Sequence, residues 1–229
     1  MDFILDYLLT LILFTPVLVA VIVVMLPGGE VKLLRWVAFL GSLIPLALSI
    51  ILWVNFNPDQ AGFQFQEQYV WYQPINSSYH VGVDGISLTM VMLTTFLTPL
   101  AILASYTIKD RVKAYMFFFL MLEMGMLGVF LSLDLLVFFV FWELGLVPMY
   151  FLINQWGSET GERELWGRKI KARTYASFKF MIYTMAGSLG LLLAIQLIGV
   201  VAGTFDMLIL FEEIGNVQGT LMGFPVSTV

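Results

Sequence analysis

Hydrophobic and polar residues alternate along this chain in long blocks. The apolar runs contain at most one charged residue each, and short polar segments separate them. Each run is long enough to cross a bilayer core of about 30 Å as an α-helix, which rises about 1.5 Å per residue. The pattern therefore predicts an all-α, polytopic membrane protein with six transmembrane helices, over residues 7–26, 36–54, 85–108, 114–133, 135–152 and 176–202.

Composition agrees with this pattern and narrows the chemistry. Hydrophobic residues make up 60% of the chain and charged residues 12%, and the mean hydropathy is +0.92, which excludes an ordinary soluble protein. The acidic start, with Asp2 and Asp6, lacks the basic region of a cleaved signal peptide, so the first run is interpreted as a retained span.

The cysteine and histidine content excludes several cofactor sites. The chain has no cysteine, which rules out a disulfide framework or thiolate-bound iron–sulfur cluster, and a single histidine, His80, rules out haem held by two histidines of this chain. His80 lies outside the apolar runs and is expected to be a surface or interfacial residue. We assign no cofactor-binding and no metal-ligating residue to the sequence.

The distribution of lysine and arginine predicts the orientation. Of the 11 basic residues, ten lie in alternate loops, namely those between spans one and two, three and four, and five and six. Cytoplasmic loops retain lysine and arginine, whereas translocated loops carry few. The amino terminus is therefore expected to face outward, away from the basic compartment. Below, "outward" means the side without basic loops and "inward" the basic side.

The segments between the spans carry less information. Residues 55–84 form a polar connection with Tyr69, Trp71, Tyr72 and Tyr79 but no lysine or arginine, which favours an aromatic belt at the membrane surface over a nucleic-acid or sugar surface. Residues 157–175 are interpreted as a solvated loop. In the final segment, the run 205–211 is too short to span and is expected to lie at the interface.

Glu143 is the first candidate for function. It is the only ionisable residue of the span 135–152, near its middle, and an acid at that depth costs roughly 2.5 to 3.5 kcal/mol on insertion scales. It should therefore face a partner or a polar cavity, and we expect it to handle protons or ions. Pro148 loosens the helix beside it. The alternative is a neutral, hydrogen-bonded acid that only packs.

Glu123 forms a possible pair with Glu143. The two acids lie ten residues before and ten residues after Leu133, so a tight helical hairpin would place them at similar depth. Gly125, Gly128 and Gly145 would allow the helices to approach closely. Glu123 and Glu143 would share a proton if they faced each other, which sequence alone leaves open.

Lys179 is the only basic residue inside a span, about five residues from the inward end of the sixth. Its side chain either snorkels to that interface or reaches inward to pair with Glu143 and gate proton movement. Other polar residues of the spans would support a file of water molecules or, as is commoner, hydrogen bonds between helices. They are Ser87, Thr94, Thr95, Ser105, Tyr183, Thr184 and Ser188.

Three stretches resemble one known family. FWELGLVPMYFLI around Glu143, VGVDGISLTMVMLT from Val81 and KFMIYTMAGSLGLL from Lys179 resemble chain M of respiratory NADH:quinone oxidoreductase, called chain 4 in organelles and cyanobacteria. This is the antiporter-like membrane subunit of complex I. The resemblance implies proton pumping through Glu143 and Glu123, which match the family's fifth-helix and fourth-helix glutamates, with Lys179 as a third proton-transfer residue.

The resemblance also implies an organisation and partners. It divides the chain into three leading helices (1–113), the first three helices of an antiporter-like inverted repeat (114–202) and an outward interfacial tail (203–229). It implies other membrane subunits of complex I as partners, with NAD, FMN, iron–sulfur clusters and quinone held by those subunits. The location would be an energy-converting membrane: bacterial inner, thylakoid or mitochondrial inner.

The sequence departs from the family in length. The family's fourteen helices include a lysine-bearing seventh and eighth, and this sequence stops before the seventh. It is expected to be a fragment or truncated product, or else a second chain supplies the missing helices. Two other functions stay open: a subunit of a multi-subunit sodium or potassium/proton antiporter, and a membrane scaffold that does not pump.

Overall fold

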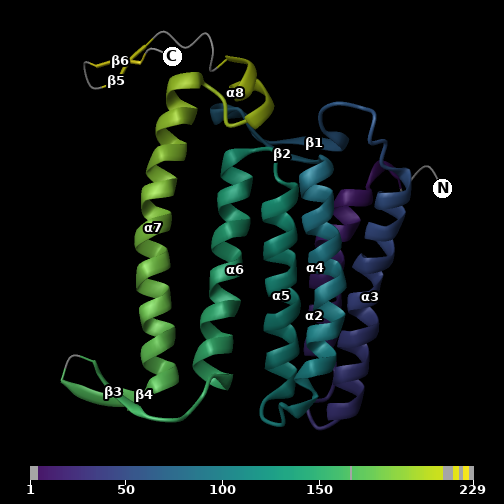
Figure 1. Ribbon diagram of the computed structural model, residues 1–229, viewed down its shortest axis with the longest axis vertical. Coiled ribbons are helices and arrows are strands. Elements are labelled where there is room, and N and C mark those ends of the chain that lie inside the picture. The colour runs from purple at the N-terminus through teal and green to yellow at the C-terminus, as the bar shows by residue number, and fades with distance from the viewer. Residues whose placement is uncertain (1–4, 166, 214–218, 222–223, 227–229) are drawn as a thin grey trace.

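Six long helices run side by side in the computed structural model, which describes residues 5–165, 167–213, 219–221 and 224–226 (Figure 1). Among these residues, six helices are long and apolar enough to cross a membrane, as predicted. They are α2 (Leu8–Met25), α3 (Val31–Asn55), α4 (Gly85–Ala104, continued by the 3-10 turn η2, Ser105–Thr107), α5 (Val112–Leu131), α6 (Leu135–Trp156) and α7 (Ala172–Ala202).

Two helices begin four or more residues earlier than the apolar runs predicted. Helix α3 starts five residues before the predicted span, and α7 starts four residues before it. Hydropathy marks the residues inside the hydrocarbon, whereas helical hydrogen bonding continues into the headgroup region, where long basic side chains extend into water. Lys32 and Arg35 therefore belong to α3, and Arg173 belongs to α7.

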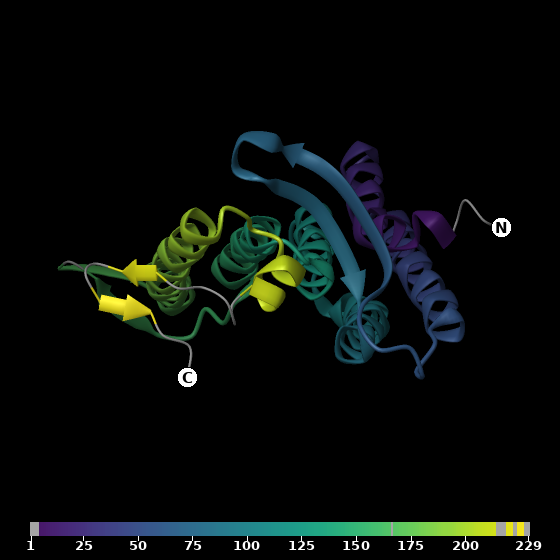
Figure 2. The ribbon, with the colours of Figure 1, turned by 90° about the horizontal axis from the view of Figure 1, so that it is seen from above.

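Helix α5 lies at the centre of the bundle. It packs against α2, α3 and α4 on one side and α6 on the other, while α7 packs against α6. The view from above shows α2, α3 and α4 gathered beside α5, with α6 and α7 extending the row away from them (Figure 2). Burial follows this order, since 33–44% of the most apolar stretch of each helix from α2 to α5 is buried, against 22% for α6 and 17% for α7.

The outward connection between α3 and α4 is a β-hairpin, which the sequence did not predict. Strand β1 (Gln64–Tyr72), the 3-10 turn η1 (Gln73–Ile75) and strand β2 (Ser77–Val83) form an antiparallel pair that lies across the outward ends of the helices (Figures 1 and 2). Most residues of β2 are buried. Tyr69, Trp71 and Tyr72 of β1 are exposed, so the aromatic belt remains a prediction for them.

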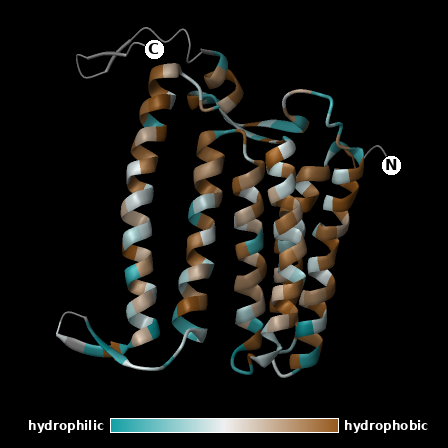
Figure 3. Ribbon diagram, viewed as in Figure 1, coloured by the Kyte–Doolittle hydropathy of each residue, from teal (hydrophilic) through white to brown (hydrophobic). Residues whose placement is uncertain are grey.

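The remaining short elements lie outside the spans. The loop predicted between α6 and α7 contains a hairpin of β3 (Glu162–Leu165) and β4 (Arg168–Lys171) at the inward end. Beyond α7 follow the short helix α8 (Met207–Glu213) and a pair formed by β5 (Gly219–Leu221) and β6 (Phe224–Val226). Hydrophilic residues concentrate at the two ends of the bundle, with brown apolar stretches between them (Figure 3).

Acidic side chains close the outward amino termini of three helices. The carboxylate of Glu67 accepts hydrogen bonds from the amides of Leu9 (2.8 Å) and Thr10 (3.2 Å) at the start of α2. Asp84 caps α4, and its own amide binds the Ser87 hydroxyl in a capping box. Asp134 caps α6 through the amides of residues 136 and 137. Each cap satisfies amides that have no partner within the helix and places negative charge at the positive end of the helix dipole.

Candidate functional site

Glu123 lies in the middle of the central helix α5 and is fully buried, with 0% of its surface exposed. The Thr98 hydroxyl of α4 lies beside the carboxyl group, but it donates its hydrogen to the Thr94 carbonyl at 2.9 Å. Neither carboxyl oxygen of Glu123 has a hydrogen-bond partner among the described residues. An acid buried without a partner costs free energy that packing alone does not return, which marks this position as a candidate for function.

Glu143 lies on the face of α6 that packs against α7. Farther along that face, the ring of Tyr150 lies 6.0 Å from the ring of Phe178, and Asn154 accepts a hydrogen bond from Thr174 at 3.3 Å. These residues follow Glu143 by seven and eleven positions, which is close to two and three helical turns. Glu143 itself is half-buried, and its Oε1 atom is buried without a partner among the described residues.

The polar groups across from Glu143 are hydroxyls of α7. The two contacts just described set the register of the antiparallel pair, and extending it places Glu143 level with residue 185 of α7, between Thr184 and Ser188. Ser188 is buried, and both hydroxyls donate to carbonyl groups of their own helix. The space between α6 and α7 therefore combines one acid with two hydroxyl groups.

Glu123 and Glu143 do not face each other. Helices α5 and α6 approach each other closely at Gly125 and Gly145, where a Cβ added to Gly125 would lie 2.9 Å from the Gly145 Cα. The expected close approach of these glycines is thus present. Each acid lies two residues before its glycine, which is a rotation of about 200° at 3.6 residues per turn. Both carboxyl groups therefore point away from the contact, Glu123 toward α4 and Glu143 toward α7.

The levels of the two acids also differ. With Gly125 level with Gly145, the antiparallel register puts Glu143 level with residue 127 of α5. Glu123 lies four residues farther from the outward side, or about 6 Å at 1.5 Å per residue. Both acids lie ten residues from Leu133, which predicted equal depth. The depths differ because the end of α5 and the start of α6 are not level. The structure brings together the helices that carry these acids, but not their carboxyl groups.

Lys179 lies on the far side of α7 from α6. Its side chain is exposed, and its ammonium group lies 6.0 Å from the centre of the Tyr175 ring and 5.8 Å from that of Tyr183, one turn away on either side. The buried residues of α7, including Ser177 and Ser188, lie on the opposite face. Lys179 makes no ion pair with Glu143 within the part of the chain that the structure describes.

Most hydroxyls of the spans bind helix carbonyl groups. Thr94, Thr98 and Thr184 bond within their own helices, while Ser49 and Thr95 join α3 to α4 at 2.8 Å. Ser105 binds the Tyr115 hydroxyl at 2.8 Å across the inward end of α4 and α5. Only the bonds of Ser49 with Thr95 and of Ser105 with Tyr115 join two helices, which is the commoner of the two uses that the sequence left open.

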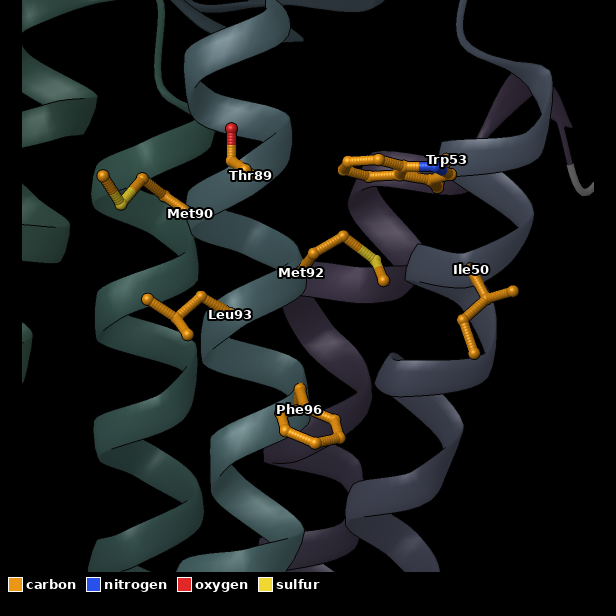
Figure 4. A pocket seen from close by; sticks show the side chains of 7 residues that line it. All are labelled: Ile50, Trp53, Thr89, Met90, Met92, Leu93 and Phe96. Atoms are coloured by element: carbon orange, nitrogen blue, oxygen red, sulfur yellow. The ribbon is translucent and has the colours of Figure 1, made fainter.

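A hollow of about 490 Å³ between α3 and α4 is apolar apart from Thr89. Ile50 and Trp53 line it from α3, and Thr89, Met90, Met92, Leu93 and Phe96 line it from α4 (Figure 4). No ionisable residue is part of this lining, so the hollow offers no group for proton transfer. Trp53, at the outward end of this hollow, and Trp36, near the inward start of α3, are both exposed, and tryptophan is common at membrane interfaces.

The prediction of a surface position for His80 is wrong. His80 is 3% exposed, and its Nδ1 atom lies 2.8 Å from Oδ2 of Asp206. The prediction failed because the polar segment 55–84 folds over the helix ends, and the segment after α7 covers it from the other side. Asp206 was not identified from the sequence, since it follows the last apolar run without a motif.

Two acids that cap helices on the outward side, Asp134 and Glu67, were also not identified from the sequence. Asp134 is fully buried, and besides capping α6 it accepts bonds from the hydroxyl of Ser77 and the amide of Ser78. An aspartate directly before an apolar run is an N-cap signal, so this role was readable. Glu67 gave no such signal, because it caps a helix nearly 60 residues away in the chain.

Comparison with known proteins covers nearly the whole chain. Residues 8–134 match the family described as NADH-ubiquinone oxidoreductase chain 4, amino terminus. Residues 132–226 match the family described as NADH:quinone oxidoreductase/Mrp antiporter, TM.

Individual relatives are much longer than this chain. It is 42% identical to NADH-ubiquinone oxidoreductase chain 4 of Marchantia polymorpha, over 80% of this chain and 35% of that protein. It is 39% identical to NADH-quinone oxidoreductase subunit M of Rhodobacter capsulatus, over 82% of this chain and 35% of that protein. The chain thus spans about a third of the length of these relatives.

Solved structures share the fold. A chain of respiratory complex I from Thermus thermophilus with bound NADH superposes with a TM-score of 0.72 at 23% identity, covering 89% of this chain and 39% of that one. A chain of the Mrp complex from Dietzia sp. DQ12-45-1b gives 0.71 at 21% identity, covering 91% of this chain and 21% of that one. These structures show the shared fold, and the family matches and identities above show that the chain belongs to the NADH-ubiquinone oxidoreductase chain 4 family, of which it matches the amino-terminal part.

Proposed function

We propose that this chain is a proton-translocating membrane subunit of an NADH:quinone oxidoreductase and has no redox centre of its own. The observation that carries the proposal is the buried Glu123, whose carboxyl oxygens have no partner among the described residues, in the central helix of a chain of this family. An acid held in that way can take up and release a proton without leaving the membrane interior.

In this proposal, Glu123, Glu143 and Lys179 act in three separate spaces around the helices. Glu123 would hold a proton between α5 and α4, and Glu143 would hold one between α6 and α7. Lys179, on the far face of α7, would act on a proton that arrives from outside this group of helices. Because the side chains point into different spaces, transfer between them would run through water or through residues beyond this chain rather than by direct contact.

Electron transfer would belong to other subunits. The chain has no cysteine, and its single histidine is bonded to Asp206, so its residues do not fit an iron–sulfur cluster or a haem. NAD, FMN and quinone would likewise bind elsewhere. We place the assembly in an energy-converting membrane of a bacterium, chloroplast or mitochondrion, with other membrane subunits against the exposed faces of α6 and α7.

The test is proton translocation by the assembled complex in sealed vesicles. Glu123→Gln and Glu143→Gln should each lower the number of protons moved per NADH oxidised, because glutamine keeps the shape and hydrogen bonding but carries no exchangeable carboxyl proton. The matched control is Glu164→Gln in the exposed β3–β4 hairpin, which should leave the ratio unchanged. Full pumping in both span variants would instead support a scaffold role.

The family description that includes the Mrp antiporter keeps a second function in view. A subunit of a sodium or potassium/proton antiporter would use the same buried acids without NADH. Vesicles that acidify on NADH addition, in the absence of added sodium or potassium gradients, would favour the oxidoreductase. Proton movement driven only by such a gradient would favour the antiporter.

A further inference from the structure

The outward face holds a buried hydrogen-bonded pair, His80 and Asp206, that the proposed proton transfer does not use. We propose that His80 and Asp206 form a proton-dependent clamp, which holds the outward end of α7 against the β1–β2 hairpin while His80 is protonated. This inference does not depend on the proposed function.

The geometry around His80 fits a ring that donates from both nitrogen atoms. Nδ1 lies 2.8 Å from Oδ2 of Asp206, and Nε2 lies 3.2 Å from Oε1 of Gln66. The Gln66 amide is held in this orientation because its Nε2 donates to the carbonyl of Phe63 at 3.0 Å. Both partners of the imidazole are therefore acceptors, and only the doubly protonated ring can donate to both.

Among the groups around Asp206, His80 is the one that can carry a positive charge. Oδ1 of Asp206 accepts the amide of Leu208 at 2.9 Å, and Oδ2 also accepts from Gln68 at 3.2 Å. The nearby acids are already bonded, Asp134 to the start of α6 and to β2, and Glu67 to the start of α2. The outward segments 55–84 and 203–229 contain no lysine or arginine that could replace the imidazolium.

The clamp joins three parts of the chain that are far apart in sequence. Beside the ion pair, the amide of Leu133 donates to the carbonyl of His80, and the amide of Met207 donates to that of Leu133, each at 2.8 Å. Asn76 of the hairpin donates to the carbonyl of Gly203 at 2.8 Å. The hairpin, the α5–α6 turn and the segment after α7 therefore form one bonded patch (Figure 1).

Helix α7 is the element that this patch restrains. Within the membrane it packs against α6, and 17% of its most apolar stretch is buried. Its inward end is held by Arg173, which donates to the carbonyl of Gln155 and pairs with Glu159 at 2.7 Å. The His80–Asp206 pair belongs to the corresponding attachment at the outward end, so weakening it would free that end to move relative to α6.

Deprotonation would weaken the clamp in a defined way. Histidine changes charge in the range between pH 5 and 8. A neutral ring has one N–H group, so it must give up either the bond to Asp206 or the bond to Gln66, and in both cases the charge assistance is lost. The attachment should therefore be complete at the acidic end of this range and weaker at the alkaline end.

Hydrogen exchange of the full chain, purified with its membrane partners, tests the proposal. The measured quantity is the protection of amides in residues 204–210, corrected at each pH for the intrinsic exchange rate. We expect protection to fall roughly fivefold from pH 5.5 to pH 8, because charge-assisted and neutral hydrogen bonds differ by about 1 kcal/mol, which corresponds to a factor of about five in an equilibrium constant. Protection that stays constant over this range in the unmodified protein would overturn the proposal.

Two variants separate the clamp from a general effect of pH. In His80→Gln the protection of 204–210 should be low and independent of pH, because glutamine bonds without titrating. In the matched control Glu67→Gln, which alters the attachment of the hairpin to the start of α2, the pH dependence of 204–210 should persist. Retention of the full pH dependence in His80→Gln would assign it to another group and contradict the proposal.

Discussion

The helices α2 to α5 and the helices α6 and α7 differ in how completely they bury the ionisable residues of their spans. The first four pack together, and α5 has α2, α3 and α4 on one side and α6 on the other, so Glu123, which points from α5 toward α4, is fully buried. Helices α6 and α7 extend as a row from this bundle and leave broad apolar faces uncovered. Glu143 on α6 is correspondingly half-buried, and Lys179 on α7 is exposed.

This difference separates two kinds of candidate residue. Glu123 has a surrounding of packed helices that is complete within the described chain, so its behaviour should be a property of this sequence. Glu143 and Lys179 border surfaces that, inside a membrane, meet lipid or other helices. Their behaviour should depend on what covers those surfaces. The substitutions below alter the contact between the two regions or compare similar substitutions in each of them.

The largest effect is expected at the contact between the regions. Gly125→Ala would put a methyl group 2.9 Å from the backbone Cα of Gly145, which must move. We expect a loss of about 3 kcal/mol, the upper end of the range for overpacked cores, because backbone rather than a flexible side chain must move. The measurement is the midpoint of thermal unfolding in nanodiscs.

The control is the other glycine of the same contact. A Cβ at Gly145 would meet nothing within 4 Å, so Gly145→Ala should leave the midpoint nearly unchanged. Equal losses in both variants would mean that α5 and α6 approach each other differently from the structure described here.

A smaller effect is expected at the outward caps. Asp134→Ala removes a buried cap of α6 together with the bonds to Ser77 and Ser78 of the hairpin, and should cost about 2 kcal/mol. Asp84→Ala removes a cap that is partly exposed and bonds only within its own turn, so about 1 kcal/mol is expected. Thermal unfolding of the two variants compares them directly, and a larger loss for Asp84→Ala would contradict the role given to Asp134.

The smallest effect concerns alkaline pH. Burial is the main cause that raises the pKa of Tyr79. The bond with Thr10 lowers the pKa, the charge of Glu67 raises it, and the net pKa is about 12. The unfolded side chain ionises near pH 10, whereas the folded one keeps its proton, so its contribution to stability is complete below pH 10 and is lost between pH 10 and 12.

Ultraviolet titration of the phenolate checks this prediction, with Tyr79→Phe as the reference. The difference between the two titrations should show one tyrosine ionising near pH 12. A tyrosine that ionises near pH 10 in that difference would mean that the hairpin does not cover Tyr79.

The six spans were predictable because a bilayer imposes one length and one polarity on every helix. The positions of Glu123, Glu143 and Lys179 along those helices could also be predicted from the sequence. Their directions were not, because direction depends on which face of each helix packs, and the sequence identified the glycines of the α5–α6 contact without fixing the rotation of the acids around it. The hairpin and the burial of His80 were missed because polar strands pair with each other and with distant segments, which leaves no periodic apolar signal.

Infrared difference spectroscopy on carboxyl groups in the assembled complex tests the central claim, that Glu123 holds a proton in the packed bundle apart from Glu143. At neutral pH, Glu123→Gln should remove a carboxyl band and leave the band lost in Glu143→Gln at its original position. If Glu123→Gln removes no band, Glu123 is not a proton-holding acid. If it shifts the band of Glu143, the two carboxyl groups interact directly, and the separation of the two spaces is wrong.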